Sequence, residues 1–340
     1  MKIIFDAMGG DNAPAEIVKG ALEAKDSLGI SIVLVGKENE IKACIGENSL
    51  PEGVEIVNAD EVITMCDDPS TAVRRKKNSS MAVALKMLAD GQGDAVVSAG
   101  STGALLTGAT LTVKRIHGIR RAAMAPVLPF GEHGVMLIDC GANVECTPEY
   151  LLQFAYMGSF YASKVMGCEN PRVGLLNVGT EDSKGGELQH RTFALLKEAS
   201  DNGRINFIGN IEGTTAYAGG VDVIVTDGFT GNVFLKGAEG TIKFIMTQLK
   251  GVFYKNLPNK LAASVLKGDL AKMKKSLDVN EVGGTAFIGI SKPVIKAHGS
   301  SKASAIVSAA RQAVKFSESG IIDDIAANID YMKIKADAEA

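Results

Sequence analysis

Five glycine-rich segments contain most of the candidate catalytic and ligand-binding residues of this sequence. Each one follows an apolar run directly and places glycine beside Asp, Asn, Ser or Thr: Asp6–Pro14, Ser98–Gly103, Asp139–Asn143, Asn177–Gly186 and Asp227–Asn232. Glycine allows the backbone to approach a ligand closely, and the amide groups at the start of a helix offer hydrogen-bond donors to an anion. A single segment of this kind is ordinary between a strand and a helix. Five of them predict one cleft for an anionic, oxygen-rich ligand.

The sequence lacks the motifs of several other kinds of catalysis. It contains no G-x-S-x-G, H-E-x-x-H, C-x-x-C or Walker A pattern, which gives no support to a serine hydrolase, a zinc protease or a P-loop nucleotidase. The four histidines are scattered, and Cys140 and Cys146 have no second cysteine pair. We therefore expect no metal site and no cofactor.

The composition excludes several classes of protein. The chain has 340 residues, of which 46% are hydrophobic, and its 36 Lys and Arg nearly balance 39 Asp and Glu. A dedicated nucleic-acid binder carries a strong basic excess, and a disordered chain has far less apolar content. Asp6 interrupts the apolar start of the sequence, which argues against a secretory signal, and the five cysteines fit a reducing cytoplasm. The length predicts two domains or subdomains.

Short apolar runs alternate with segments of helical length. The runs are rich in β-branched residues and almost unbroken in hydrophobicity, as strands covered on both faces are. The predicted strands are Lys2–Phe5, Ile32–Val35, Val54–Val57, Ala95–Ser98, Val135–Ile138, Val173–Asn177, Asn206–Gly209 and Val221–Val225. The predicted helices are Pro14–Leu28, Ser80–Ala89, Tyr150–Met166, Glu187–Ser200 and Val233–Phe253. This alternation predicts a doubly wound α/β fold with a mostly parallel sheet, whose ligands bind at the carboxyl ends of the strands.

The uncharged segment Ala95–Val113 is long enough to span a bilayer. Nine of its nineteen residues are Gly, Ser or Thr, a polarity that suits contact with protein and water better than contact with lipid. We expect a buried strand, a glycine-rich turn and a helix there, and no transmembrane helix.

The segment Lys236–Lys275 is basic and amphipathic. It contains nine lysines but only two acidic residues, and its apolar residues recur at helical spacing. Pro258 should divide it into a helical hairpin, which we place at 240–275. A basic amphipathic helix favours an anionic membrane surface or a partner protein; the alternative is a helix packed in the core or in a dimer, with its lysines in water. The residues assigned to the membrane are Leu257, Leu261 and Val265.

Asp6–Pro14 resembles the opening signature of the bacterial phosphate acyltransferases of phospholipid synthesis. These enzymes convert acyl-acyl carrier protein and inorganic phosphate into acyl phosphate and free carrier protein. The similarity runs from residue 3 to about residue 330, although the family usually has Asn where this sequence has Ser101. The further motifs that carry the resemblance are Ser98–Leu105, Asp139–Val144, Pro171–Gly179, Asp227–Asn232, Gly283–Gly284 and Ile295–Ser301.

The resemblance implies a fold like that of phosphotransacetylases and isocitrate dehydrogenases, with two subdomains and a protruding amphipathic helical hairpin. We expect residues 1–125 and 285–333 to form the first α/β subdomain, 126–284 the second, and 334–340 a flexible tail. The resemblance also implies a homodimer in the cytoplasm, whose hairpin meets the inner face of the cell membrane. The implied partners are acyl carrier protein, inorganic phosphate and a membrane glycerol-3-phosphate acyltransferase, without nucleic acid.

Acyl transfer from a thioester to phosphate needs neither a strong base nor a serine nucleophile. A phosphate monoester has a second pKa of about 6 and a free thiol a pKa of about 8.5, so phosphate is already nucleophilic and the thiol leaves readily near pH 7. The remaining task is to position the reactants and to stabilise an oxyanion. We assign phosphate to the turns Ser98–Gly103 and Asp139–Asn143. The full set of residues predicted to bind phosphate or substrate is Asp6, Asn12, Ser98, Ser101, Thr102, Gly103, Asp139, Asn143, Asn177, Asp227, Thr230, Gly231 and Ser300.

Three residues receive catalytic roles in this prediction. Lys184 supplies positive charge; the alternative is a solvated lysine beside acidic neighbours. Asn232 polarises the thioester carbonyl; the alternative is a plain N-cap of a helix that begins near Val233. His298 donates a proton or binds phosphate; the alternative is a structural histidine with satisfied hydrogen bonds.

A basic run precedes the helix cap predicted at Ser79 and Ser80. Cations at a helix N-terminus oppose the helix dipole, so we assign the run to an anionic partner, the acidic carrier protein or its phosphopantetheine arm. The alternative is a solvated charge run. The residues of the run are Arg74, Arg75, Lys76 and Lys77.

Two other functions stay open at this point. One is a phosphotransacetylase-like transferase that uses acyl-coenzyme A and phosphate. The other is a non-catalytic scaffold that binds lipid or carrier protein, although a scaffold has no need of the glycine-rich segments. An isocitrate-type dehydrogenase is weaker, because no nicotinamide motif and no acidic metal cluster are evident.

Overall fold

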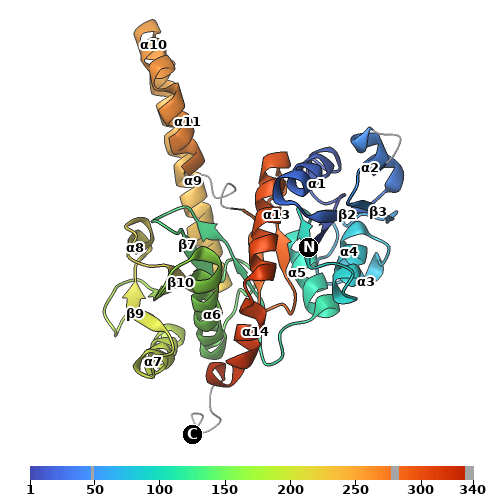
Figure 1. Ribbon diagram of the computed structural model, residues 1–340. Helices are drawn as coiled ribbons and strands as arrows, with labels where there is room; N and C mark the ends of the chain where they lie inside the picture. The colour runs from blue at the N-terminus through green and yellow to red at the C-terminus, as the bar shows by residue number, and fades with distance from the viewer. Residues whose placement is uncertain (47–49, 277–282, 334–340) are drawn as a thin grey trace.

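Two β-sheets form the framework of the structure, a computed structural model that describes residues 1–46, 50–276 and 283–333. The first sheet has seven strands in the order β3-β2-β1-β4-β12-β11-β5. They are β3 (Val54–Asn58), β2 (Ser31–Gly36), β1 (Lys2–Asp6), β4 (Ala95–Ser98), β12 (Val294–Lys296), β11 (Thr285–Ile288) and β5 (Ala123–Ala125). Segments from the two ends of the sequence therefore lie side by side in this sheet (Figure 1).

The second sheet has five strands in the order β6-β7-β10-β8-β9. They are β6 (Val127–Leu128), β7 (Val135–Ile138), β10 (Val223–Val225), β8 (Arg172–Leu176) and β9 (Asn206–Ile211). Neighbouring strands from β3 to β12 in the first sheet, and from β7 to β9 in the second, are parallel. Antiparallel pairs are confined to β5, β6 and β11. The predicted doubly wound, mostly parallel α/β fold is confirmed.

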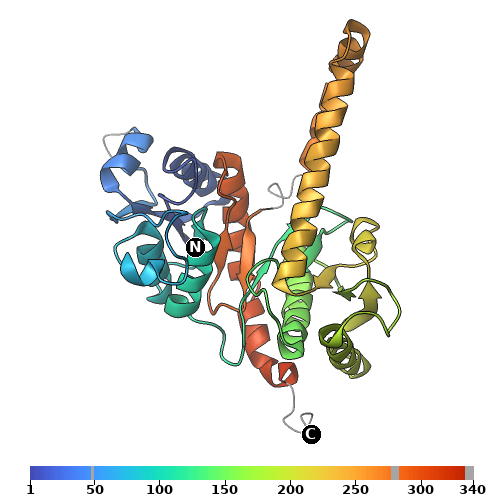
Figure 2. The ribbon, with the colours of Figure 1, turned by 180° about the vertical axis from the view of Figure 1, so that it is seen from behind.

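Helices cover both faces of the first sheet and flank the second (Figures 1 and 2). Because the side chains of a strand alternate between its faces, Ile3 and Phe5 of β1 enter the core beside α1 and α13, while Ile4 enters the core beside α4. In chain order the helices are α1 (Ala15–Leu28), α2 (Glu38–Ile45), α3 (Ala72–Arg75), α4 (Ser80–Ala89), α5 (Thr102–Gly108), η1 (Ala109–Val113), α6 (Pro148–Tyr161), η2 (Ala162–Met166), α7 (Glu187–Asp201), α8 (Gly213–Tyr217), α9 (Gly228–Phe253), α10 (Leu257–Val265), α11 (Lys267–Ser276), α13 (Ala303–Glu318), α14 (Ile321–Ala327) and η3 (Ile329–Met332).

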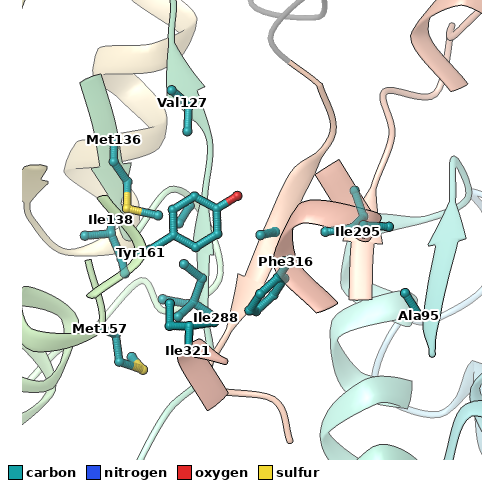
Figure 3. Packing of buried hydrophobic residues seen from close by; sticks show 14 of the residues in the cluster. Ala95, Val127, Met136, Ile138, Met157, Tyr161, Ile288, Ile295, Phe316 and Ile321 are labelled. Atoms are coloured by element: carbon teal, nitrogen blue, oxygen red, sulfur yellow. The ribbon is translucent and has the colours of Figure 1, made fainter. Parts of the chain in front are cut away.

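One apolar core joins the two sheets. Tyr161 of α6 meets Phe316 of α13 edge to face, with 5.7 Å between ring centroids, and both are almost fully buried (Figure 3). Gln312 donates a hydrogen bond of 2.8 Å to the Tyr161 hydroxyl, which satisfies that buried polar group. The core thus fixes the two sheets relative to each other. The predicted boundaries at 1–125, 126–284 and 285–333 stay a prediction, and 334–340 lies outside the described residues.

The predicted elements agree with the structure except at some of their ends. The helix Ser80–Ala89 is reproduced, and Ser79 caps it by accepting a hydrogen bond of 3.3 Å from Ala82 N. The helix predicted from Val233 instead begins at Gly228, because Asp227 accepts a hydrogen bond from Thr230 N and caps it five residues earlier. Asn232 is therefore inside the helix, and its alternative role as an N-cap is wrong.

The segment 95–113 folds as the sequence predicts. It forms β4, a turn, α5 and η1, and the strand is buried throughout. Within the described part of the chain, no helix has the length and apolar content needed to cross a membrane.

A helical hairpin projects from the second sheet (Figures 1 and 2). α9 leads away from the body and ends at Phe253, and α10 begins at Leu257 with Pro258 in its first turn. Proline is tolerated there because the first amides of a helix have no intrahelical acceptor. From Glu239 to Leu270 no residue is buried. The predicted protruding hairpin, with its break near Pro258, is confirmed.

Candidate active site

Asp6 is the centre of a buried polar network at the carboxyl end of β1. Its carboxylate accepts hydrogen bonds from Ser80 Oγ at 2.5 Å and from Ser98 Oγ at 2.6 Å. Ser98 Oγ in turn accepts a bond of 3.1 Å from Gly100 N. Burial raises the pKa of Asp6, while the two hydroxyl donors and the charge of Lys296 act in the opposite direction. The network fixes the turn that follows β4 against β1 and the start of α4.

Backbone and side-chain bonds tie the loop after β1 to the loop after β12, and both loops lie beside this turn. Asn12 Nδ2 donates to the Ser300 carbonyl at 3.1 Å, and Asp11 N donates to the Gly299 carbonyl at 2.8 Å. A Cβ on Gly10 would lie 2.9 Å from Ala99 Cβ, and Gly10 has a φ of +108°. Only glycine suits that conformation and that close approach. Three loops thus meet at the ends of β1, β4 and β12.

His298 lies in the loop after β12 and is exposed. Its Nδ1 accepts a hydrogen bond of 3.2 Å from Ser300 N and lies 2.9 Å from Ser300 Oγ. A backbone N–H can only donate, so Nδ1 is unprotonated and a neutral ring carries its proton on Nε2. His298 therefore has an N–H donor that these local contacts leave unused.

The Ser98–Gly103 turn leads directly into α5. Ser101 is buried, and no side chain caps the first turn of this helix. The first amides of a helix have no acceptor within it, so the amides that follow Ser101 are available to an anion. A Cβ on Gly103 would lie 2.8 Å from Pro69 Cβ, which requires glycine at that position.

Asp139 is the centre of a second network, at the carboxyl end of β7. Its buried carboxylate accepts bonds from the backbone amides of Met124, Cys140, Ala142 and Asn143 at 2.6–3.3 Å, and from Asn143 Nδ2 at 3.0 Å. Burial raises the pKa of Asp139 to about 6, against the lowering effect of these donors. The carboxylate thus uses most of the amides of its own turn.

The start of α9 packs against this second network. Asp227 accepts bonds from Thr230 N at 2.8 Å and from Thr230 Oγ1 at 2.7 Å, so these two side chains serve each other as a helix cap. A Cβ on Gly231 would lie 2.0 Å from the Asp139 carbonyl oxygen, so only glycine fits. Asn232 is exposed and lies near Gly141, where a Cβ would be 3.7 Å from Asn232 Cγ.

The loop after β8 brings Asn177 and Lys184 together. Asn177 Nδ2 donates a bond of 3.0 Å to the Lys184 carbonyl. The Lys184 ammonium group is 3.9 Å from Glu181, and the lysine side chain is 47% exposed. β8 is the neighbour of β10, and β10 is the neighbour of β7. Asn177, Asp227 and Asp139 therefore follow three adjacent parallel strands.

The predicted site residues form two groups, one on each sheet. The first group contains Asp6, Asn12, Ser98, Ser101, Thr102, Gly103, His298 and Ser300. The second group contains Asp139, Asn143, Asn177, Lys184, Asp227, Thr230, Gly231 and Asn232. Met124 of β5 lies between them, because its amide donates to Asp139 while β5 belongs to the first sheet. Only β11 separates β5 from β12, so these two strands are roughly 10 Å apart. The prediction of a single cleft for all five turns stays a prediction.

The basic run does not lie at the start of α4. Arg74 and Arg75 belong to the last turn of α3, where cations match the helix dipole. Lys76 forms an ion pair of 2.7 Å with Asp67. The premise that four cations oppose the dipole of the following helix is therefore wrong. Arg74, Arg75 and Lys77 are exposed, and their assignment to carrier protein stays a prediction.

Sequence reasoning missed two residues of the first network, Ser80 and Lys296. The sequence predicts Ser80 only as the start of a helix, yet its hydroxyl donates to Asp6 across 74 residues of sequence. Lys296 is a lysine within the apolar segment Val294–Ala297, which is the signal that could have marked it, and it is only 8% exposed. Among the described residues, no group of three or more His, Cys, Asp or Glu side chains is arranged to hold a metal ion.

Several solved structures share this architecture. A phosphotransacetylase from Staphylococcus aureus is 16% identical with a TM-score of 0.61, covering 93% of this chain and 94% of that chain. A phosphotransacetylase from Streptococcus pyogenes is 18% identical with a TM-score of 0.59, covering 92% and 94%. At such low identity the likeness concerns the fold alone. The chain is thus an α/β protein of the phosphotransacetylase fold class.

The sequence relatives are much more similar. A phosphate acyltransferase from Bacillus cereus is 49% identical over 314 residues, 92% of this chain and 93% of the relative. Another from Oceanobacillus iheyensis is 46% identical over 331 residues, 97% of this chain and 98% of the relative. The profile of a family described as "Fatty acid synthesis protein" matches residues 1–324. The chain belongs to this family, and the resemblance to phosphate acyltransferases is confirmed.

Proposed function

We propose that this chain transfers a fatty acyl group from the thioester of acyl carrier protein to inorganic phosphate, giving acyl phosphate for phospholipid synthesis. Its family membership makes it an acyltransferase that acts with phosphate. The observation that carries the phosphate site is the Ser98–Gly103 turn. Asp6 holds this turn in place, no side chain caps the first amides of α5, and His298 lies on the adjoining loop.

The turn after β7 is less suited to phosphate than the sequence predicts. The amides of Cys140, Ala142 and Asn143 already donate to Asp139. Phosphate would have to compete with that carboxylate and would be repelled by its charge. We therefore give Asp139 and Asn143 the role of holding the turn beside Asn232, and we place the thioester at this second group.

The proposed reaction needs one nucleophilic attack and one departure. An oxygen of the phosphate dianion forms a bond to the thioester carbonyl carbon, and the carbon–sulfur bond breaks to release the carrier thiolate. The Asn232 amide donates to the developing oxyanion, and Lys184 adds positive charge. His298 Nε2–H donates to a phosphate oxygen or protonates the departing thiolate.

The activity is tested by incubating the protein with acyl-acyl carrier protein or acyl-coenzyme A and phosphate, and by trapping acyl phosphate with hydroxylamine. We expect product from the carrier-protein thioester. Product only from acyl-coenzyme A would favour the phosphotransacetylase-like alternative, and tight binding without product would favour the scaffold.

The assignment of the two groups is tested by separate kinetic constants. Thr102→Ala should raise the KM for phosphate, while Asn232→Ala should lower kcat by roughly 100-fold, as the loss of an oxyanion donor does. Thr247→Ala, an exposed position on the same helix as Asn232, is the matched control. Turnover near that of the wild type in Asn232→Ala and Lys184→Ala would end the assignment.

We propose that the tip of the hairpin binds the anionic inner face of the cell membrane. Leu257, Leu261 and Val265 recur every four residues on one face of α10 and are 71%, 63% and 84% exposed. Lys255, Lys260 and Lys267 lie next to them in sequence and suit anionic lipid. Leu257→Glu should reduce co-sedimentation with anionic vesicles. Equal recovery of variant and wild type in the supernatant would contradict the proposal.

We propose that the shaft of the hairpin forms a homodimer. Phe244, Ile245 and Val252 on α9 are 62%, 49% and 59% exposed, in a stretch of the hairpin that contains no buried residue. Exposed apolar residues that recur along one helix suit contact with a second copy. Phe244→Glu should give a monomer by light scattering, whereas Leu257→Glu should leave the dimer intact. A monomeric wild-type protein would rule the dimer out.

The same assignment suggests where the product goes. Acyl phosphate made at a membrane surface is well placed for a membrane glycerol-3-phosphate acyltransferase, and the carrier protein can dock on the exposed cations Arg74, Arg75 and Lys77. Substituting all three by Ala should raise the KM for acyl-acyl carrier protein and leave that for phosphate unchanged. An unchanged KM for the carrier substrate would move the docking site elsewhere.

A further inference from the structure

Lys296 is a buried lysine at the end of β12, the strand that pairs with β4 through Ser98. Its ammonium group donates to the carbonyl of Ala99 at 3.3 Å and to the carbonyl of Ala297. One carbonyl belongs to the Ser98–Gly103 turn and the other to the loop that carries His298. A single side chain therefore links the two loops at which we place phosphate.

The charge of Lys296 is not neutralised by an ion pair with the described residues. The carboxylates of Asp6 and Asp11 act on it only from beyond ion-pair distance. The two carboxylate oxygens of Asp6 instead accept hydrogen bonds from Ser80 and Ser98. Burial lowers the pKa of Lys296 to about 8, which leaves it largely cationic near pH 7. A buried cation without an ion pair lowers the free energy of unfolding. An apolar side chain of similar size would fill the same space without that loss.

Lys292 makes a comparable bond at the other end of β12. It precedes that strand, is partly buried, and donates a bond of 2.8 Å to the carbonyl of Leu88 in α4. Its lysine-to-carbonyl bond resembles those of Lys296, but it lies away from the three loops. Lys292 therefore serves as a control for a lysine-to-carbonyl bond outside the candidate site.

We propose that Lys296 is a positioning residue for phosphate: its two carbonyl bonds set the Ser98–Gly103 turn against the His298 loop, and its positive charge favours the dianion there. This inference rests on the proposed function. Lys296 acts through Ala99 and need not touch phosphate itself. The proposal implies a small, doubly charged oxyanion as the ligand. The uncharged thioester group is not attracted by the positive charge of Lys296.

The test uses the full chain and three variants. Lys296→Met removes the charge and the two bonds, Lys296→Gln keeps an amide donor but removes the charge, and Lys292→Met is the matched control. We expect Lys296→Met and Lys296→Gln to raise the KM for phosphate at least tenfold and to change the KM for acyl-acyl carrier protein less than twofold. Both should keep the wild-type thermal midpoint or exceed it, and Lys292→Met should keep both KM values.

A second measurement separates this inference from the proposed function. Inorganic phosphate at millimolar concentration should raise the thermal midpoint of the wild type and of Lys292→Met, but not that of either Lys296 variant. A phosphate KM within twofold of the wild type, or an equal phosphate-induced shift in the Lys296 variants, would overturn the inference. A wild-type protein that forms no acyl phosphate but shows the Lys296-dependent shift would overturn the proposed function alone.

Discussion

Asp6 and Asp139 are both buried, but they obtain their hydrogen-bond donors from different places. Asp6 accepts hydroxyl groups from Ser80 and Ser98, which lie 74 and 92 residues away in sequence. Asp139 accepts mainly amides of its own turn, one to four residues away. The first carboxylate therefore joins β1 to β4 and to the start of α4, whereas the second mainly holds its own turn and adds one bond from Met124 of β5.

The difference supports the proposal that the first group binds phosphate and that Asp139 holds its own turn in place. Around Asp6 the backbone amides after Ser101 stay available, because the carboxylate takes side-chain hydroxyls. Around Asp139 the amides already donate to the carboxylate, whereas the side chains of Asn232 and Lys184 in the same group are exposed. A glycine-rich turn after a strand is thus no proof of an anion site, since its own aspartate can occupy the donors.

The largest expected effect is that of Gly231→Ala in the second group. The new Cβ would lie 2.0 Å from the backbone oxygen of Asp139, an atom that cannot move aside without breaking the turn. We expect a loss of more than about 3 kcal/mol in the free energy of unfolding, measured in urea. Gly237→Ala on the same helix, where no atom lies within 4 Å of the new Cβ, should instead gain about 0.5–1 kcal/mol. A small loss for Gly231→Ala would show that the turn is loosely held.

Removing each carboxylate in turn tests the comparison directly. Asp139→Ala leaves several amides in one buried turn without an acceptor and should cost about 3 kcal/mol, whereas Asp6→Ala leaves two hydroxyls that can rotate and should cost about 2 kcal/mol. Urea unfolding of both variants measures the difference. The reverse order would mean that the long-range network stabilises the fold more than the local one.

The pH dependence of stability should carry the signature of Asp139. Its pKa is raised by burial from 3.8 to about 6, so the folded chain binds this proton more tightly than the unfolded chain. Its contribution is fully present below about pH 4 and is lost as the pH rises through 6, by up to about 3 kcal/mol. The unfolding free energy of the wild type minus that of Asp139→Asn should therefore fall by up to about 3 kcal/mol as the pH rises from 4 to 7. Parallel curves would contradict this assignment.

The smallest effect on stability should be that of Lys184→Ala. The side chain is half exposed and its pairing with Glu181 is long, so the free energy of unfolding should change by less than about 0.5 kcal/mol. Its catalytic efficiency with acyl-acyl carrier protein should nevertheless fall about tenfold, because a cation near the thioester is lost. Lys197→Ala, an exposed lysine on the neighbouring helix α7, is the control. An unchanged catalytic efficiency would mean that Lys184 has no role at the thioester.

Much of the fold is fixed by local patterns that the sequence displays. β1 and β4 are uninterrupted apolar runs because both of their faces are covered, and the break of the hairpin follows from Pro258. The start of α9 is harder to predict from the sequence, because Asp and Asn both cap helices well. The hydrogen bond that Thr230 N donates to Asp227 identifies Asp227, and not Asn232, as the cap. The resemblance to phosphate acyltransferases rests on motifs in order along the chain, which need no coordinates.

The fold class, the family and the segments that hold polar residues follow from periodicity and from contiguous motifs in the amino-acid sequence. The three-dimensional arrangement of the strands sets which hydrogen-bond donors already have an acceptor. It brings Asp6 together with Ser80 and Ser98, and it directs the amides after Asp139 toward that carboxylate. It also places the ammonium group of Lys296 between two loops of the first group. Hydrogen-bond partners that are far apart in sequence become neighbours only when parallel strands are set side by side, and no local pattern encodes which ones meet.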